Sequence, residues 1–165
     1  TPRGTPVIYS GPETGFMRGH AEHDGNRNYY GQERVDAASK SPIYGNLKRI
    51  ATLRRDSVAL QRGLQLNLRL KGDEAAFYRV YEHDGQAQTA LVLLNKGDAA
   101  RTIKLDELVE PGDWRDGFSG ETVKLDDTLA LDVPAHGVRV LFLDRPLALQ
   151  PLREKLLYSM AHKNR

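Results

Sequence analysis

The stretch Leu64-Gln65-Leu66-Asn67-Leu68-Arg69-Leu70 alternates strictly between apolar and polar side chains. A period of two residues is typical of a β-strand that buries one face and exposes the other. Gly63, directly before the stretch, is a residue type that often ends a helix. The sequence therefore predicts that the chain changes here from helix to sheet.

Further strands are expected on the C-terminal side of this stretch. Residues 76–81 and 89–94 flank Asp84-Gly85, a dipeptide that favours the tight turn of a β-hairpin. Four more short strands are expected at residues 102–105, 121–125, 128–133 and 137–143. Turn signals separate them, among them Pro111-Gly112-Asp113. Closely spaced short strands of this kind predict an antiparallel β-sandwich, and we place its boundaries at residues 63 and 145.

A helix is expected before the sandwich. Ser41-Pro42 is a typical helix start, with serine as the N-cap and proline in the first turn. Apolar side chains then recur at helical spacing at Ile43, Leu47 and Ile50. The pattern predicts an amphipathic helix with one apolar face.

The first part of the chain carries a different kind of strand. Pro6-Val7-Ile8-Tyr9 is a short apolar run, typical of a strand that a parallel sheet buries on both faces. A long polar stretch follows it, residues 11–40, which we predict as a loop. Because a buried strand followed by a helix is the repeating unit of a (β/α)₈ barrel, we interpret residues 1–62 as the last such unit. The rest of that barrel is then a missing N-terminal portion.

A second helical pattern follows Pro151. Leu152, Leu156 and Met160 lie at helical spacing and predict a C-terminal helix within residues 146–165. Its apolar stripe is expected to dock either on the sandwich or on the missing barrel. The predicted fold class is thus mostly β: the last β/α unit of a barrel, an antiparallel sandwich and a C-terminal helix.

Composition excludes several kinds of function. The 165 residues carry 24 basic and 22 acidic side chains, so the formal net charge is only +2 and does not favour a nucleic-acid partner. No apolar run approaches the roughly 20 residues of a membrane-spanning helix. The sequence has no Cys, which excludes disulfides and thiolate chemistry. Because it starts at Thr1 without Met or a secretory signal, we expect a piece of a longer protein.

Three stretches in the first part of the chain match the end of a known barrel. Residues 4–13 read Gly-Thr-Pro-Val-Ile-Tyr-Ser-Gly-Pro-Glu, and Asp24-Gly25-Asn26-Arg27 follows in the loop. Residues 47–60 contain Leu53-Arg54-Arg55 and end in Ala59-Leu60. These stretches resemble the eighth strand, the following Asp-Pro-x-Asn-Arg loop and the eighth helix of the alpha-amylase family, glycoside hydrolase family 13. The loop is one residue shorter here.

The predicted sandwich is similar to the C-terminal domain of the same family. Residues 91–95 (Leu-Val-Leu-Leu-Asn), 112–120 (Gly-Asp-Trp-Arg-Asp-Gly-Phe-Ser-Gly) and 133–137 (Val-Pro-Ala-His-Gly) resemble its motifs in the family's order. The resemblance covers roughly residues 4–144 and is closest to cyclomaltodextrin glucanotransferases. It implies a C-terminal portion of an enzyme that processes starch or maltodextrins.

The resemblance also implies that the catalytic groups are elsewhere. Retaining cleavage needs a carboxylate nucleophile and a carboxylic acid, and in this family strands four, five and seven carry them with a third carboxylate. Glu22-His23-Asp24 superficially resembles one of these motifs, but it follows strand eight, and Glu82-His83-Asp84 lies in a predicted hairpin. We assign no catalytic residue, and the chain alone is expected to be inactive.

Substrate contact is expected in the polar loop. By the resemblance, Asp24 and Arg27 hydrogen-bond a glucose unit of an alpha-glucan oligosaccharide, with Asn26 as the rival contact because the loop is one residue short. The alternative is an Asp24–Arg27 ion pair that only fixes the loop. The resemblance implies no cofactor or metal in this chain, calcium in the rest of the enzyme, and a secreted or periplasmic location.

Several other residues allow two interpretations, one functional and one structural. His20 and His23 can hold a metal or remain solvated, and Tyr29 and Tyr30 can stack on sugar or pack under the loop. Trp114 is expected as a core side chain rather than an exposed starch-binding platform.

Two other functions compete with the enzyme fragment. One is a stand-alone carbohydrate-binding β-sandwich, and the other is an interaction protein that adds its strand 6–9 to a partner's sheet. A free module has no use for this buried strand, so residues 4–9 discriminate among the readings.

Overall fold

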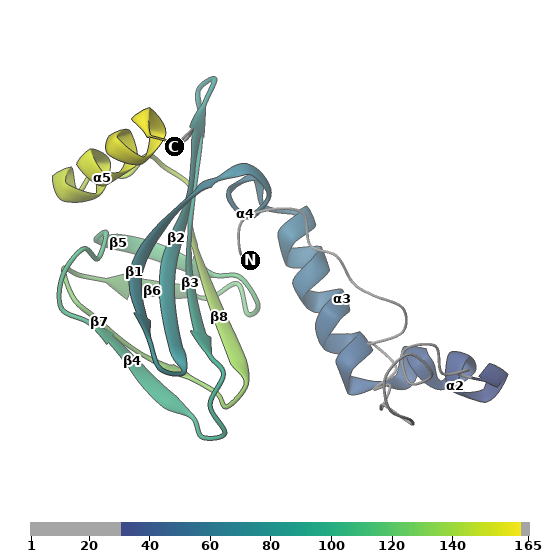
Figure 1. The fold of residues 1–165 in the computed structure, drawn as a ribbon. Coiled ribbons are helices and arrows are strands. Elements are labelled where there is room, and N and C mark those ends of the chain that lie inside the picture. The colour runs from purple at the N-terminus through teal and green to yellow at the C-terminus, as the bar shows by residue number, and fades with distance from the viewer. Residues whose placement is uncertain (1–30, 163–165) are drawn as a thin grey trace. The chain divides into compact units, whose positions relative to one another are not determined.

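The computed structural model describes residues 31–162 (Figure 1). Contacts divide these residues between Leu53 and Arg54 into a helical segment and a sheet domain. The helical segment comprises residues 31–53 and the sheet domain residues 54–162. The two are described separately below.

The helical segment contains α2 (Gly31–Ala37), the 3-10 turn η2 (Ala38–Lys40) and most of α3 (Pro42–Arg55). The start of α3 is confirmed: the Ile43 amide donates to Ser41 Oγ at 3.2 Å. The prediction of a loop is wrong over α2, a helix without an apolar stripe whose Gln32 and Asp36 side chains bond at 2.8 Å. Pairs four residues apart stabilise such a polar helix, and a search for apolar periodicity misses it.

The sheet domain holds eight strands: β1 (Leu64–Lys71), β2 (Glu74–His83), β3 (Gln86–Asn95), β4 (Arg101–Leu105), β5 (Gly112–Asp116), β6 (Thr122–Leu125), β7 (Leu129–Val133) and β8 (Gly137–Leu143). One sheet has the order β1-β2-β3-β8-β5-β6 and the other pairs β4 with β7, all antiparallel. The predicted antiparallel strands are confirmed. The β2–β3 turn is also confirmed, because Asp84 and Gly85 have φ of 49° and 75°, as the tight hairpin turn requires.

Strand β5 is a correction. The sequence predicts a turn at Pro111-Gly112-Asp113, whereas Gly112 and Asp113 are the first two residues of this strand. Trp114 is its only large apolar side chain, so the five residues carry almost no alternation. Pairing with β6 and β8 on either side, rather than a local pattern, makes this segment a strand.

A single core receives side chains from both sheets. Its fully buried members include Tyr78, Leu91, Leu93, Trp114 and Leu141 of the large sheet. The small sheet contributes Ile103, Leu105, Leu129 and Val133. The core lies between the sheets, and Leu64, Leu66 and Leu68 of the first strand pack in or against it.

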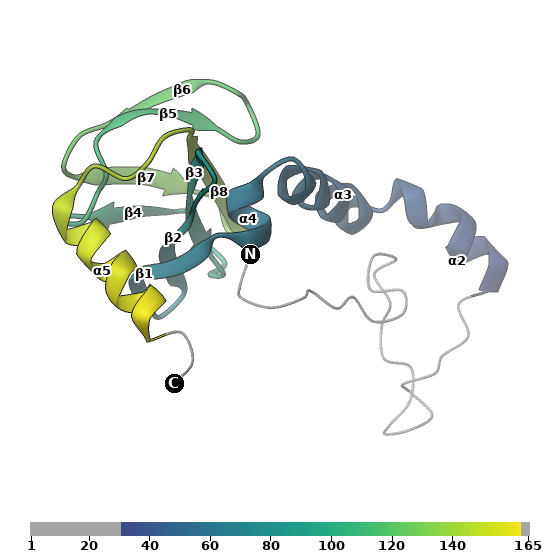
Figure 2. The same cartoon turned by 90° about the horizontal axis from the view of Figure 1, so that it is seen from above.

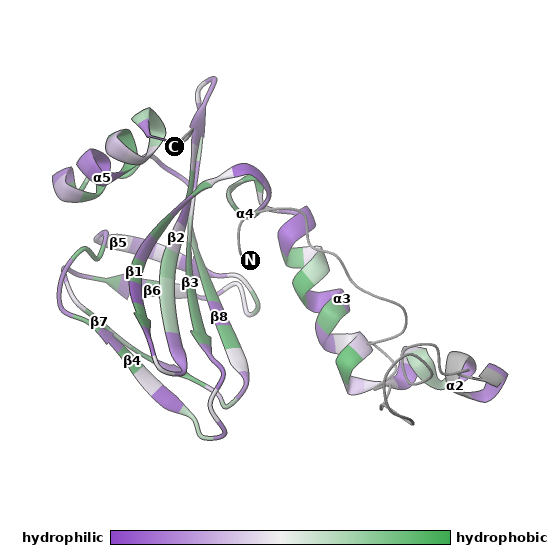
Figure 3. Ribbon diagram, in the orientation of Figure 1, coloured by the Kyte–Doolittle hydropathy of each residue, from purple (hydrophilic) through white to green (hydrophobic). Residues whose placement is uncertain are grey.

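The middle of the large sheet is buried on its outer face as well. Phe77, Val92 and Val140 are paired across β2, β3 and β8, and all three are buried although they point away from the core. Figure 3 shows apolar residues running along these strands. The one-sided pattern predicted for β1 therefore does not extend to the central strands, and in β1 itself a bulge follows Asn67 and leaves Leu70 exposed.

Two helices pack on the sheets. The short α4 (Val58–Arg62) is capped by Ser57, whose Oγ accepts from the Leu60 amide at 3.1 Å and donates to Gln88 Oε1 at 2.7 Å. Gly63 follows it, and a Cβ there would lie 2.5 Å from the Ala59 carbonyl oxygen. This helix lies within residues 1–62, the predicted barrel unit, and it contacts β2 and β3.

The C-terminal helix α5 (Gln150–Ala161) lies beside β1 (Figure 2). Leu152 and Leu156 are buried in the core, so the stripe docks on the sheet domain. Met160, predicted in the same stripe, is exposed. None of the described helices is both long and apolar enough to span a membrane.

Candidate functional site

The predicted substrate contacts Asp24, Asn26 and Arg27 lie outside the described residues. The same holds for the strand 6–9, for His20 and His23, and for Tyr29 and Tyr30. Their roles stay predictions, and the site below is built from the sheet domain alone.

Trp114 is a core residue, as expected. It has no exposed surface, its ring stacks on Tyr78 at 6.0 Å between centroids, and its indole N–H donates to the Glu110 carbonyl at 3.0 Å. Burial raises the pKa of the Tyr78 phenol, and the hydroxyl accepts from the Glu110 amide at 3.0 Å. Neither ring is available to stack on a sugar.

The buried carboxylate of Glu110 fixes the segment that follows the last strand. Its Oε1 accepts from Arg145 Nη1 at 2.7 Å and from the Ala148 amide at 2.8 Å, and its Oε2 accepts from the Leu149 amide at 2.8 Å. Glu82 holds the same segment, because its Oε1 accepts from the Leu147 amide at 3.0 Å. These bonds set the path from β8 to α5.

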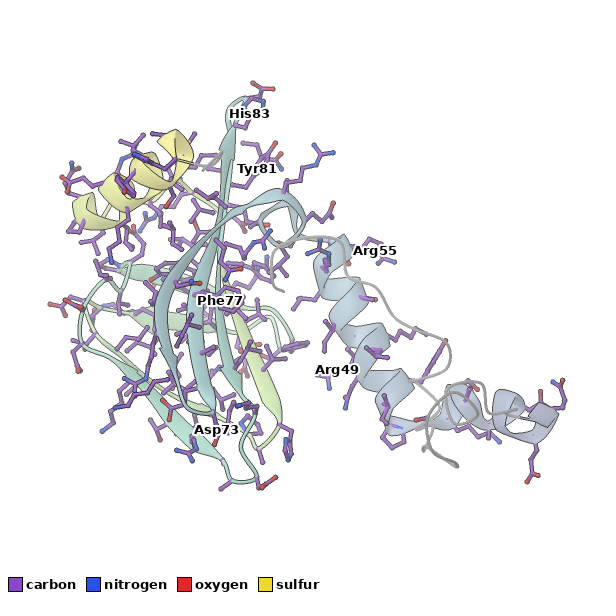
Figure 4. The ribbon with its side chains drawn as sticks, viewed as in Figure 1. Arg49, Arg55, Asp73, Phe77, Tyr81 and His83 are labelled. Carbon is purple, nitrogen blue, oxygen red and sulfur yellow. The ribbon has the colours of Figure 1, made fainter. Side chains whose placement is uncertain are left out.

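A hollow of about 320 Å³ lies where this segment leaves the large sheet, and we call it the hairpin groove. Pairing of β3 with β8 ends at Thr89 and Leu143, so the hairpin tip extends beyond β8. Figure 4 shows Tyr81 and His83 on this projecting hairpin. The groove is lined by Glu82, His83, Asp84, Gly85, Gln86, Ala87, Asp144, Arg145 and Pro146.

The lining combines acceptors and donors. Glu82, Asp84 and Asp144 supply carboxylate oxygens, while Arg145 and His83 supply N–H groups. His83 Nε2 lies 3.2 Å from Asp84 Oδ2 at the exposed tip. The Glu82-His83-Asp84 triplet is thus part of a hairpin turn, and Glu82 is engaged in holding the chain rather than facing a second catalytic carboxylate.

The sequence alone does not identify Asp144 and Arg145 as site residues. They directly follow the last strand and belong to no motif, so only the turn of the chain towards Glu110 brings them beside the hairpin. Within residues 31–162, no group of three His, Cys, Asp or Glu side chains is placed to hold a metal ion. We therefore name no metal ligand among them.

A second hollow, of about 380 Å³, lies at the other end of the large sheet beside the β1–β2 turn. Its floor includes Leu70 and Leu94, and its charges pair with one another: Asp73 lies 3.7 Å from Lys96 Nζ. Glu74 similarly bonds Arg69 at 3.0 Å. This hollow is larger, and its charges pair within the protein as those of the hairpin groove do. It differs in having no ring side chain in its lining.

Comparison with solved structures gives the fold. An alpha-amylase from Geobacillus thermoleovorans in complex with acarbose matches 86% of this chain with a TM-score of 0.64 and 24% identity. The fold is that of the C-terminal part of alpha-amylases. The amylase-type fold also matches a cyclomaltodextrin glucanotransferase with a three-domain ABC distribution, over 87% of this chain with a TM-score of 0.60 and 24% identity.

A third match with the amylase-type fold is the cyclic alpha-maltosyl-(1→6)-maltose hydrolase from Arthrobacter globiformis, at a TM-score of 0.54 and 20% identity over 84% of this chain. The chain spans only 30%, 30% and 27% of the three matched chains. No protein-family model and no curated protein sequence matches it. The predicted resemblance is thus confirmed at the level of the fold.

Proposed function

We propose that the chain is the C-terminal part of an alpha-glucan-processing glycoside hydrolase or glucanotransferase that acts on starch or maltodextrins. The matched enzymes are more than three times as long as the stretch they share with this chain, which supports a fragment. The parent then cleaves with retention, by hydrolysis or transglycosylation. Its catalytic carboxylates lie on the portion that precedes this chain.

The observation that carries the proposal is an unused apolar helix face. No residue of α3 is buried, and Ile43 and Ile50 are 45% and 38% exposed although they lie on the apolar stripe. Since burying such a side chain contributes about 1.5–3 kcal/mol, a helix of this kind is stabilised by a partner surface. The neighbouring strands of a barrel supply such a surface for its eighth helix.

The outer face of the large sheet supports the same view. A free sandwich exposes polar side chains on its outer faces, whereas this sheet carries Phe77, Val92 and Val140 there. All three are already buried within this chain, so the large sheet is covered on both faces, unlike a two-layer module whose outer face is solvated. This observation disfavours the alternative of a stand-alone carbohydrate-binding module.

In the parent enzyme, the chain contributes to substrate binding from the loop after strand eight. Asp24 and Arg27, or Asn26 in place of one of them, are proposed to hydrogen-bond a glucose unit, since a carboxylate accepts from sugar hydroxyls and a guanidinium donates to them. A calcium ion, if the parent uses one, belongs to the preceding portion. The chain's own task is then to complete the barrel and to hold the substrate.

The test is to extend the reading frame upstream and to express both forms. We expect about seven further β/α units, with three carboxylates on strands four, five and seven. The extended protein should degrade starch, and the present chain should give no products with maltoheptaose. Substituting Asp24 with Ala in the extended protein should raise KM more than it lowers kcat. An upstream region without these units, together with glucan binding by the chain alone, would favour the stand-alone module.

A further inference from the structure

We propose that the hairpin groove binds a neutral sugar unit of an alpha-glucan chain. The choice of alpha-glucan rests on the proposed function, whereas the choice of a sugar rests on the groove itself. The volume of about 320 Å³ lies at the lower end of the range of small-molecule pockets. One sugar unit at the end of a chain is therefore a suitable occupant.

The walls of the groove are held in place before any ligand arrives. Arg145 is fixed by Glu110 and by the Pro111 carbonyl, which accepts from Nη2 at 2.6 Å. Asp144 Oδ1 accepts from Gln88 Nε2 at 2.8 Å, and Arg115 Nη2 lies 3.7 Å from its Oδ2. Because an ordered site loses little conformational entropy on binding, such fixation favours a weak polar ligand.

The carboxylates keep acceptor capacity for a ligand. An ionised carboxylate offers about four lone-pair sites, and Glu82 uses Oε1 for the Leu147 amide while its Oε2 lies 3.9 Å from Arg153. Asp144 is engaged by one short hydrogen bond. Hydroxyl groups can donate to the remaining sites and accept from N–H donors, which is how sugars bind.

The charge of the groove narrows the ligand class. Its carboxylates have basic partners: Asp144 lies 3.7 Å from Arg115 and Glu82 lies 3.9 Å from Arg153. With these charges largely balanced inside the protein, the groove offers no strong field to a phosphate or a free cation. The described residues offer no three-ligand metal group, so a neutral polyhydroxy compound fits the lining better than a metal ion does.

His83 gives the groove a flat ring beside its hydroxyl-binding groups. Its side chain is 69% exposed and lines the groove, and the Tyr81 ring meets it edge-on at 6.4 Å between centroids (Figure 4). Sugar sites combine such a ring with a few placed polar groups. Because the His83 side chain is largely exposed, its removal is expected to disturb binding with little effect on folding.

The test is a titration of the whole chain with maltoheptaose, followed by amide and imidazole NMR resonances. We expect saturable shifts at His83, Gln86 and Arg145. His83→Ala should raise Kd about fivefold, the equivalent of one net hydrogen bond, and Ala87→Phe, which fills the groove, should abolish the shifts. His136→Asn is the matched control, because His136 is 65% exposed beside Asp98 and lies outside the groove.

Each outcome bears on one proposal. Shifts that appear only elsewhere, or a Kd that neither variant changes, overturn the groove site, while activity of the extended protein still supports the proposed function. Equal binding of cellohexaose would overturn the assignment to alpha-glucans. If the extended reading frame lacks the catalytic units but the groove binds maltoheptaose, the enzyme proposal fails and the sugar site stands.

Discussion

Two helices of similar length, α3 and α5, differ in how far their apolar side chains are buried. The 12 residues of α5 bury Leu152 and Leu156 in the core of the sheet domain, whereas none of the 14 residues of α3 is buried. Both carry apolar side chains at helical spacing, as Figure 3 shows for each by itself. The difference lies in the surface that each helix finds.

An apolar stripe thus indicates that a helix packs against some surface, but the stripe does not indicate which surface that is. The helix α5 packs on the core beside β1. Glu110 and Glu82 hold the segment that leads into it, because they accept from the Leu149 and Leu147 amides. Within the helical segment, residues 31–53, no residue of α3 is buried. Four substitutions test this contrast between a completed core and an exposed helix.

The largest effect is expected in the completed core. Trp114→Ala should lower the free energy of unfolding by about 3–5 kcal/mol, because the buried indole leaves a cavity. Urea unfolding should be followed by circular dichroism, since the sequence has one Trp and the variant loses its fluorescence. Trp114→Phe keeps a ring against Tyr78 and should cost less. A loss below about 1 kcal/mol would mean that the core repacks freely.

The next effect concerns the attachment of α5. Glu110→Gln removes the charge that receives Arg145 and the Ala148 and Leu149 amides, so we expect a loss of about 2 kcal/mol. Chymotrypsin should then cleave faster after Leu147 or Leu149, in the segment between β8 and α5. Glu107→Gln, at an exposed position in the same loop, is the control. Equal proteolysis of both variants would show that apolar contacts alone hold the helix.

A smaller, pH-dependent effect is expected at Asp116. Burial raises the pKa of its carboxyl, but the amides of Ser119 and Phe118 and the side chain of Arg139 lower it more, so the pKa lies below its ordinary value. The stabilisation is therefore present above the ordinary pKa of about 3.9 and is lost as the pH falls through the folded-state pKa.

Asp116→Asn removes this titration. The variant should be less stable than the parent chain at pH 7, and the gap should narrow as the pH is lowered towards 3. Thermal unfolding at several pH values measures it. A gap of constant size would assign the effect to turn geometry, since Asp116 Oδ1 also accepts from the Phe118 and Ser119 amides at 2.9 and 3.0 Å.

The smallest effect is expected on the exposed helix. Ile50→Gln should change the unfolding free energy of the sheet domain by less than about 0.5 kcal/mol, as for surface positions in general. In the extended protein of the proposed function, the same change should destabilise the barrel. A loss above 1 kcal/mol in the present chain would show that α3 already has a partner.

The sequence predicted most of the sheet domain. Strict alternation located β1, Asp84-Gly85 located the hairpin, and Ser41-Pro42 located the start of α3. It failed at β5, where turn-forming residues open a strand, and at α2, which lacks an apolar stripe. In both segments the local pattern is weak, so neighbouring strands or polar pairs decide the conformation.

The candidate groove could not be predicted from the sequence. Glu82-His83-Asp84 stands out as a triplet, but Asp144 and Arg145 are about 60 residues away and follow a strand without any motif. Their meeting depends on the register that pairs Thr89 with Leu143 and on the turn towards Glu110. Neither the point where β3–β8 pairing ends nor the burial of a carboxylate can be recognised from the neighbouring residues in the sequence.

The sequence by itself determined most strands, the β2–β3 hairpin and the helices α3 and α5, because side-chain periodicity and turn residues act over a few neighbouring positions. Tertiary structure alone decided that the central strands of the large sheet are buried on both faces, that α5 completes the core, and that Glu110 is buried. These outcomes depend on contacts between residues far apart in the chain, and such contacts are fixed only when the sheets pair and the core closes.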